Sequence, residues 1–157
     1  MQIRTAAEDD PAWVVSEHGR IYAAEFGFDA GFERNIAGKM EAFIAKDDAF
    51  KRLWIAEVDA CKVGSIAISR IAGDTAFLNF VLVDPACRGR GIAGAMMDTA
   101  LSHARANGFP FVRLETYSVL KDARALYAKR GFRIVETTTG VENYGRSFDV
   151  EFWAMHL

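Results

Sequence analysis

The stretch RGRGIAG, residues 88–94, places two arginines and three glycines directly after an apolar segment. Glycine lets a backbone approach a phosphate closely, and arginine adds fixed positive charge. A helix that begins here would also point its unpaired N–H groups at an anion. The stretch therefore predicts a loop that binds a pyrophosphate, and two glycine patterns within it specify different ligands.

The first pattern is the dinucleotide fingerprint G-x-G-x-x-G, which begins at Gly89. In its favour, Glu115 lies 21 positions after Gly94, where a ribose-binding acid is expected. Against it, the preceding strands are joined by tight turns, and only 42 residues follow Glu115, too few for a second nucleotide-binding half. A P-loop is excluded because no Lys-Ser or Lys-Thr follows the glycines. The second pattern, R-x-x-G-x-A from Arg88, is favoured.

Length and composition indicate one globular domain spanning residues 1–157. The chain is 51% apolar and 25% charged, and its formal net charge is −2, so we expect neither disorder nor a nucleic-acid partner. The N-terminus lacks an apolar signal core, and no run of eighteen apolar residues occurs, so we expect a cytoplasmic protein with no membrane partner. Cys61 and Cys87 have no neighbours at metal-ligand spacing; we expect reduced thiols and no metal site.

Hydrophobic periodicity predicts the elements that must position the loop. Residues 3–6 are expected to form a strand, and a helix follows with Asp10 as its cap and Pro11 at its first position. A break at FGFDAG precedes a second helix over FERNIAGKMEAFIAK. The remaining predicted elements are an antiparallel meander of strands at 53–58, 63–70 and 76–83, a helix at 92–108, a strand at 111–116, a helix at 119–130, and strands at 133–139 and 149–157.

Two motifs in this order resemble those of the GNAT acetyltransferases. VLVDPACRGRGIAGAMM is similar to the acyl-CoA motif, in which Arg or Gln, two residues, Gly, one residue, and Gly or Ala hold the CoA pyrophosphate. A second signature, A-x-x-L-Y-x-x-x-G-F, is met by Ala123, Leu126, Tyr127, Gly131 and Phe132. The resemblance implies the GNAT fold, a mixed α/β fold with a central twisted, mostly antiparallel sheet of six to seven strands and helices on both faces.

Several segments are similar to one branch of this superfamily, the acetyltransferase half of proteins that fuse a MarR-type DNA-binding domain to a GNAT domain. The similar segments are RIYAAEFGFD, FERNIA, WIAEVDACKVGSI, VLKDARALYAKRGFR and NYGRSFDVEFW. No winged-helix segment precedes Met1, so we do not expect a DNA-related role.

The resemblance implies an acetyl-CoA-dependent N-acetyltransferase and assigns the residues that bind acetyl-CoA. Val81 and Val83 would hydrogen-bond the pantetheine arm, and a backbone N–H near Leu82 or Val83 would polarise the thioester carbonyl. The predicted pyrophosphate contacts are Arg88, Gly89, Arg90, Gly91, Ile92 and Ala93. Ser118 and Arg124 are assigned to cofactor binding as well.

The same resemblance makes Tyr127 the candidate acid, whose hydroxyl would stabilise the leaving sulfur. The base is less specified: Glu25 is our catalytic candidate, Asp29 and Glu115 are alternatives, and an ordered water could serve instead. The three histidines are expected to be structural: His18, His103 and His156.

The acceptor is expected to be the amine of a small molecule or of a protein. Asp29, Glu33 and Glu142 indicate a cationic acceptor only weakly. Two alternatives stay open, a non-catalytic CoA-binding module with the same fold and an O-acyltransferase or longer-chain acyltransferase. The aromatic-rich final strand, with EFW at 151–153, is a candidate for pairing between the subunits of a homodimer.

Overall fold

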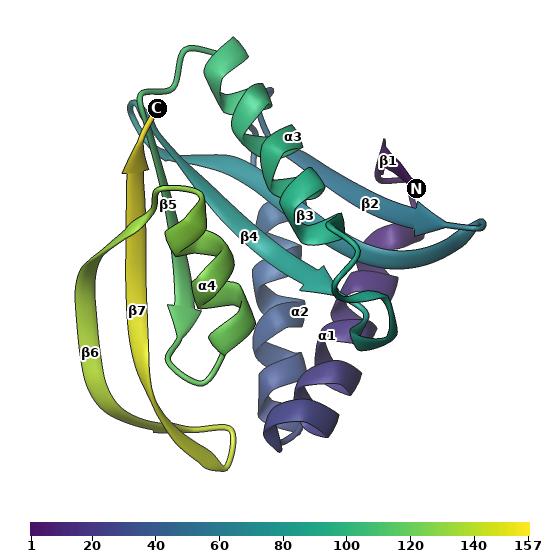
Figure 1. Cartoon of the computed structure of the whole chain (residues 1–157), viewed down its shortest axis with the longest axis vertical. Helices are drawn as coiled ribbons and strands as arrows, with labels where there is room; N and C mark the ends of the chain where they lie inside the picture. The colour runs from purple at the N-terminus through teal and green to yellow at the C-terminus, as the bar shows by residue number, and fades with distance from the viewer.

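A single seven-stranded sheet, with helices on both faces, organises the computed structural model, which describes residues 1–157 (Figure 1). The strands are β1 (Gln2–Thr5), β2 (Arg52–Val58), β3 (Cys61–Ala72), β4 (Thr75–Val83), β5 (Phe111–Tyr117), β6 (Arg133–Asn143) and β7 (Arg146–His156). Their order is β1-β2-β3-β4-β5-β7-β6, and only the β4–β5 pair is parallel. The predicted mixed α/β class and mostly antiparallel sheet are confirmed.

The helices are α1 (Asp10–Phe26), α2 (Ala30–Ala45), α3 (Ile92–Ala106) and α4 (Lys121–Lys129), with a short 3-10 turn at Pro85–Cys87. Helices α3 and α4 cover one face of the sheet and α1 and α2 the other (Figure 1). None of them combines the length and apolar character that crossing a bilayer requires.

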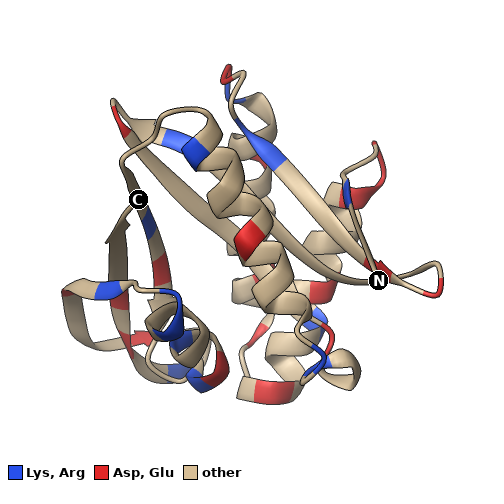
Figure 2. Ribbon diagram, turned by 45° about the horizontal axis from the view of Figure 1, so that its top comes forward, with Lys and Arg blue, Asp and Glu red and all other residues tan.

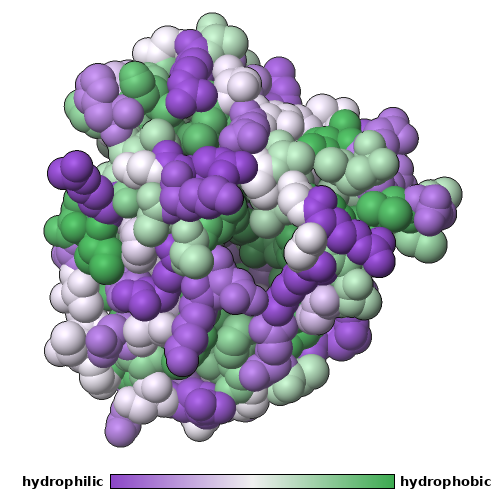
Figure 3. All heavy atoms as spheres, in the orientation of Figure 1, coloured by the Kyte–Doolittle hydropathy of each residue, from purple (hydrophilic) through white to green (hydrophobic).

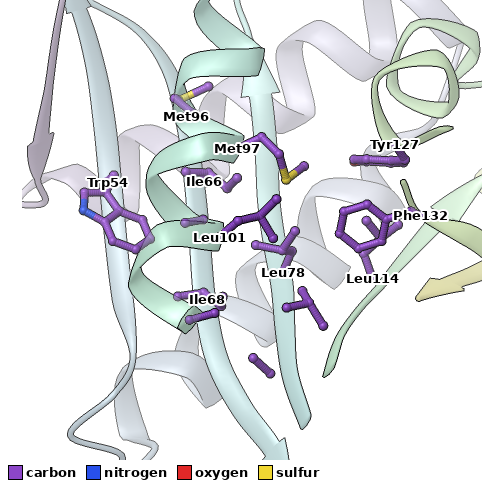
Figure 4. Close-up of a cluster of buried hydrophobic side chains, with 14 of the residues drawn as sticks. Trp54, Ile66, Ile68, Leu78, Met96, Met97, Leu101, Leu114, Tyr127 and Phe132 are labelled. Carbon is purple, nitrogen blue, oxygen red and sulfur yellow. The ribbon is translucent and has the colours of Figure 1, made fainter. Parts of the chain in front are cut away.

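Each face of the sheet has its own core. Under α3 and α4, Met97 and Leu101 of α3 lie in one cluster with Leu78 of β4 and Leu114 of β5 (Figure 4), and Met96 lies against Gly64 of β3. Under α1 and α2, the core is richer in aromatic rings; it includes Phe28, Phe32, Phe80, Tyr117 and Phe148. The apolar stripes predicted for the helices are thus buried on opposite sides of one sheet.

Strands β4 and β5 pair only at their beginnings and then diverge (Figure 1). Their last paired residues are Leu78 and Leu114. Phe80, just beyond, has a left-handed φ of 53°, and its N–H donates to Oδ1 of Asn79 at 3.0 Å instead of to β5. The Phe80 carbonyl accepts from the Ser65 hydroxyl at 2.6 Å. Side chains thus replace the lost ladder at this kink and let the strands open.

Two details at the ends of the chain differ from the sequence prediction. Asp9 rather than Asp10 precedes α1, and the carboxylate of Asp10 is fully buried against Arg4 and Lys62, at 2.6 and 2.8 Å. The second difference is the length of the β6–β7 hairpin. Strand β6 continues to Asn143 and β7 begins at Arg146, whereas the predicted strands end at residue 139 and begin at residue 149. Strand β6 is almost wholly exposed, so it lacks the apolar alternation that marks a half-buried strand.

The final strand lies inside the sheet rather than at its edge. Strand β7 pairs with β5 on one side and with β6 on the other. The suggestion that EFW at 151–153 pairs between subunits is therefore wrong, because both of its edges are occupied. The free edge on this side of the sheet belongs to β6.

Candidate active site

A cavity of about 690 Å³ opens between the N-terminus of α3, helix α4 and the end of α1. The surface is hollowed there and has an apolar floor (Figure 3). Most residues predicted to bind acetyl-CoA line this cavity: Val81, Leu82, Val83, Arg88, Gly89, Gly91, Ile92 and Ala93. Arg90 is exposed and does not line it.

The loop before α3 presents a row of backbone donors. Gly89 and Gly91 have left-handed φ values of 78° and 76°, which side chains disfavour. None of the N–H groups from residue 89 to residue 94 donates a hydrogen bond within the protein, and the first helical bond runs from Ala95 to Gly91. Free donors at a helix N-terminus fit a pyrophosphate.

Charge in the cavity favours an anion. Four cations line it, Arg88, Lys121, Lys129 and Arg130, against two anions, Glu25 and Asp122. Lys and Arg residues gather on and beside α4 (Figure 2). The lysines and Arg130 were missed in the sequence, although Lys121 and Lys129, two turns apart, fall on one side of the predicted helix.

The open edge of β4 supplies the donors expected for the pantetheine arm. The Asp84 N–H donates to the carbonyl of Val63 in β3 at 2.7 Å. Because successive N–H groups alternate along a strand, Leu82 also faces β3, whereas Val81 and Val83 face the side that β5 has left. This alternation favours Val83 over Leu82 as the group that polarises a carbonyl in the cavity.

Two predicted cofactor ligands lie elsewhere. Arg124 donates to both carboxylate oxygens of the buried Glu151, at 2.9 and 3.0 Å, and Glu151 also accepts from Trp153 Nε1. The Ser118 hydroxyl accepts from the N–H of Asp149 at 2.9 Å. Both residues fasten α4 and the turn before it to β7. The structure does not support their assignment to cofactor binding.

The candidate bases are also separated. Glu25 lines the large cavity, where Arg88 Nη1 lies 2.6 Å from its Oε1. Asp29 caps α2 by accepting from the Gly31 N–H at 2.9 Å. Glu115 alone of the three lines the opening between β4 and β5. The pair with Arg88 places Glu25 beside the loop at residues 88–94.

We call this opening the strand gap; it is a narrow cavity of about 60 Å³ whose polar lining includes His18, Lys39, Glu115, Thr116 and Tyr127. Along β5, Leu114 belongs to the core under α3 and α4, and Tyr117 to the core under α1 and α2. By alternation, Thr116 faces the α4 side with Tyr127, and Glu115 faces the α1 side. The strand gap therefore has polar groups on both faces of the sheet.

Tyr127 is held at the strand gap by the second motif. Gly131, with a φ of 97°, ends α4, and the next N–H, that of Phe132, bonds back to the Tyr127 carbonyl at 3.0 Å. The Phe132 ring packs against the tyrosine, with its centroid 6.0 Å away (Figure 4). The centroid of the Trp153 ring lies 6.1 Å from that of Tyr127. Burial raises the pKa of Tyr127, whose hydroxyl makes no hydrogen bond within the protein.

Residues 8–132 match the family model described as Acetyltransferase (GNAT) family. The chain belongs to the GNAT acetyltransferase family. With this fold and the loop at residues 88–94, this GNAT acetyltransferase is an acetyl-CoA-dependent N-acetyltransferase, and acetyl-CoA is its cosubstrate.

Individual relatives agree with the family. The uncharacterized N-acetyltransferase YjgM of Escherichia coli K12 is 30% identical over 142 residues, which cover 87% of this chain and 84% of YjgM. A streptothricin acetyltransferase of Escherichia coli is 25% identical over 85% of this chain and 77% of its own. The structure of yncA from Salmonella typhimurium, solved with its cofactor acetyl-CoA, superposes with a TM-score of 0.77 at 18% identity, covering 99% of this chain and 93% of yncA.

Proposed function

We propose that this acetyltransferase transfers an acetyl group directly to the amine of a small molecule at the strand gap, with Tyr127 as the acid and Glu115 as the base. One observation carries the proposal: the strand gap and the large cavity share Tyr22, Val81 and Leu120 in their walls. A ligand in the large cavity and a ligand in the gap would thus meet beside Tyr127.

The residues of the large cavity fit acetyl-CoA. The free N–H groups of residues 89–94 and the surrounding cations would hold the pyrophosphate, and the open edge at Val81 and Val83 would hold the pantetheine arm. When bound, acetyl-CoA supplies a thioester whose acetyl group an amine can take, with a thiolate as the leaving group.

The protein's part is to place the reactants and move protons. Holding them in register supplies much of the rate. Glu115 would accept a proton from the amine on the α1 side of the strand gap. Tyr127, protonated at neutral pH because burial raises its pKa, would donate a hydrogen bond to the departing sulfur on the α4 side.

The strand gap has room for the reacting end of an acceptor only. About 60 Å³ admits an amino group and the first carbon beside it, so the rest of the acceptor would lie outside the gap. The similarity to a streptothricin acetyltransferase supports a small molecule over a protein amine. We further propose that the chain belongs with the acetyltransferase half of MarR-type fusions and that it is cytoplasmic, a location supported by its two free cysteines, Cys61 and Cys87.

Turnover with a panel of small amines tests the proposal. We expect thiol release from acetyl-CoA to depend on the amine, and mass spectrometry to find the N-acetylated product. Binding of acetyl-CoA without turnover of any amine would favour the non-catalytic module instead. Parallel panels of alcohols and of longer acyl-CoA thioesters distinguish the O-acyl and longer-chain alternatives.

A further inference from the structure

His18 is buried on α1, but only one of its ring nitrogens is bonded. His18 is 2% exposed, and its Nδ1 is 2.7 Å from the carbonyl oxygen of Val14. A carbonyl can only accept, so Nδ1 carries the proton and Nε2 of the neutral ring keeps its lone pair. Stacking on Tyr22 and edge contact with Phe80 fix the ring plane.

The imidazole is neutral at physiological pH. Burial lowers its pKa to about 4, the bond to Val14 opposes this shift, and the positive charge of Lys39 adds to it. A neutral Nε2 is a hydrogen-bond acceptor. It accepts no hydrogen bond within the protein, although His18 lines the strand gap.

The strand gap also contains the one buried side-chain polar atom of the protein that lacks a hydrogen-bond partner. Thr116 is 3% exposed, and its Oγ1 makes no hydrogen bond. Buried polar atoms are nearly always paired, by protein, water or ligand. The unpaired hydroxyl of Thr116 and the accessible Nε2 of His18 lie on opposite faces of one opening, which Glu115 also lines, and together they indicate a gap that can hold a polar ligand.

We propose that His18 is a specificity-determining residue, whose Nε2 accepts a hydrogen bond from the acceptor's amino group and thereby selects primary amines. The inference rests on the acceptor position proposed above. It adds a contact that the motifs do not contain, because His18 lies outside both of them.

The chemistry of amide formation explains the selectivity. A primary ammonium group carries three N–H bonds: one proton passes to Glu115 before nitrogen attacks the acetyl carbon, and a second passes to the departing thiolate as the C–N bond forms and the C–S bond breaks. One N–H remains in the amide product, and this is the bond that His18 can hold throughout. A secondary amine ends with no N–H, which would leave Nε2 unpaired, and its extra alkyl group needs room in a narrow gap.

Kinetics with a primary amine that the enzyme acetylates, and with the N-methyl derivative of that amine, test the inference. His18→Phe keeps a ring for packing but removes the acceptor, and we expect kcat/KM for the primary amine to fall at least about tenfold, the effect of one lost hydrogen bond. The preference over the N-methyl amine should shrink by the same factor, while KM for acetyl-CoA stays the same. His18→Gln, which offers a carbonyl oxygen near the position of Nε2, should restore part of both values.

His156→Phe, the same substitution at an exposed position of β7 outside both cavities, is the matched control and should change neither kcat/KM nor the preference for the primary amine. An active wild-type enzyme with unchanged selectivity in His18→Phe would overturn the inference and leave the proposed function intact. No turnover of any amine by the wild type would overturn both. Should the variants fail to fold, the ¹⁵N resonance of His18 Nε2 in the wild type decides: it should shift when the N-acetylated product is added, and a constant resonance rejects the contact.

Discussion

Arg88 in the loop at residues 88–94 is ion-paired with Glu25 near the end of α1: its Nη1 lies 2.6 Å from Oε1 and 2.8 Å from Oε2 of the glutamate. The hydrogen bond to Glu25 raises the pKa of Arg88. Both side chains line the cavity that we assign to acetyl-CoA, so a bound phosphate would compete with Glu25 for the guanidinium.

Glu25→Gln should therefore improve acetyl-CoA binding. The change removes a negative charge from the cavity and frees Arg88, so we expect KM for acetyl-CoA to fall by up to about fivefold, as is typical of a partly exposed pair, with kcat unchanged. Glu17→Gln, which breaks the Arg20 pair on the same helix, is the control. A loss of kcat of two orders of magnitude would instead make Glu25 the base.

Gly91→Asp should weaken acetyl-CoA binding without unfolding the protein. A Cβ at residue 91 meets no atom within 4 Å, so the cost to the fold is the strain of a φ of 76°, about 1–2 kcal/mol. The carboxylate would repel the pyrophosphate, and KM for acetyl-CoA should rise at least about tenfold. Gly73→Asp, at another positive-φ turn with open space, is the matched control for strain and charge. An unchanged KM for acetyl-CoA in Gly91→Asp would show that this loop does not hold the pyrophosphate.

Arg124→Met should cost stability rather than cofactor affinity. Glu151 is buried, and the substitution leaves it with only Trp153 Nε1 as a partner. We expect the free energy of unfolding to drop by about 1–3 kcal/mol, discounted because Arg124 is partly exposed. Denaturant unfolding and KM for acetyl-CoA are measured for Arg124→Met and for a control, Arg133→Met. Arg133 is exposed and forms no ion pair. A raised KM for acetyl-CoA with unchanged stability would show that Arg124 binds acetyl-CoA after all.

The buried His18 should make stability depend on pH. Its pKa of about 4 lies below the ordinary value of 6.5, so between these pH values the unfolded chain binds a proton that the folded chain does not. The free energy of unfolding should thus fall as pH drops from 6.5 to 4, by about 3 kcal/mol in total. Urea unfolding across this range, compared with His18→Phe, isolates the effect; identical slopes for both proteins would contradict the buried neutral histidine.

The sequence predicted what local patterns encode. Glycines in the loop at 88–94, the Gly131–Phe132 turn and the order of elements all depend on residues close in the chain, and these predictions agree with the structure. The roles of Ser118 and Arg124 depend on Asp149 and Glu151, about thirty residues away, and no local pattern reveals such partners.

The acceptor side was harder to predict for a related reason. His18 reaches the strand gap because α1 packs over the kink at Phe80, where the Phe80 N–H donates a hydrogen bond to the side-chain oxygen of Asn79. A lone histidine on an apolar helix face is more often structural, and here it is both buried and part of a cavity wall. Of the three candidate bases, Glu115 alone lines the strand gap, and only the assembled sheet shows this difference from Glu25 and Asp29.

Tyr127→Phe should lower kcat more than it changes KM for acetyl-CoA. Phenylalanine keeps the packing against Phe132 and Trp153, so the substitution isolates the hydroxyl. A hydrogen bond to sulfur strengthens as negative charge develops on the leaving thiolate, so its loss falls on the transition state. We expect kcat to drop by about one to three orders of magnitude, measured by single-turnover kinetics so that product release does not mask the chemical step.

Tyr22→Phe is the informative comparison, because Tyr22 lines both cavities and burial raises its pKa to about 12. If the position of Tyr127 at the strand gap makes it the acid, only Tyr127→Phe should lower kcat strongly. A large effect of Tyr22→Phe on kcat, with normal kcat in Tyr127→Phe, would make Tyr22 the acid instead.

Because burial raises the pKa of Tyr127 above its ordinary value of 10, wild-type kcat should also show no loss from tyrosine ionisation below pH 10. A tyrosine-dependent fall in kcat near neutral pH would show that Tyr127 titrates in an open, hydrated site, contrary to its burial between α4 and the sheet.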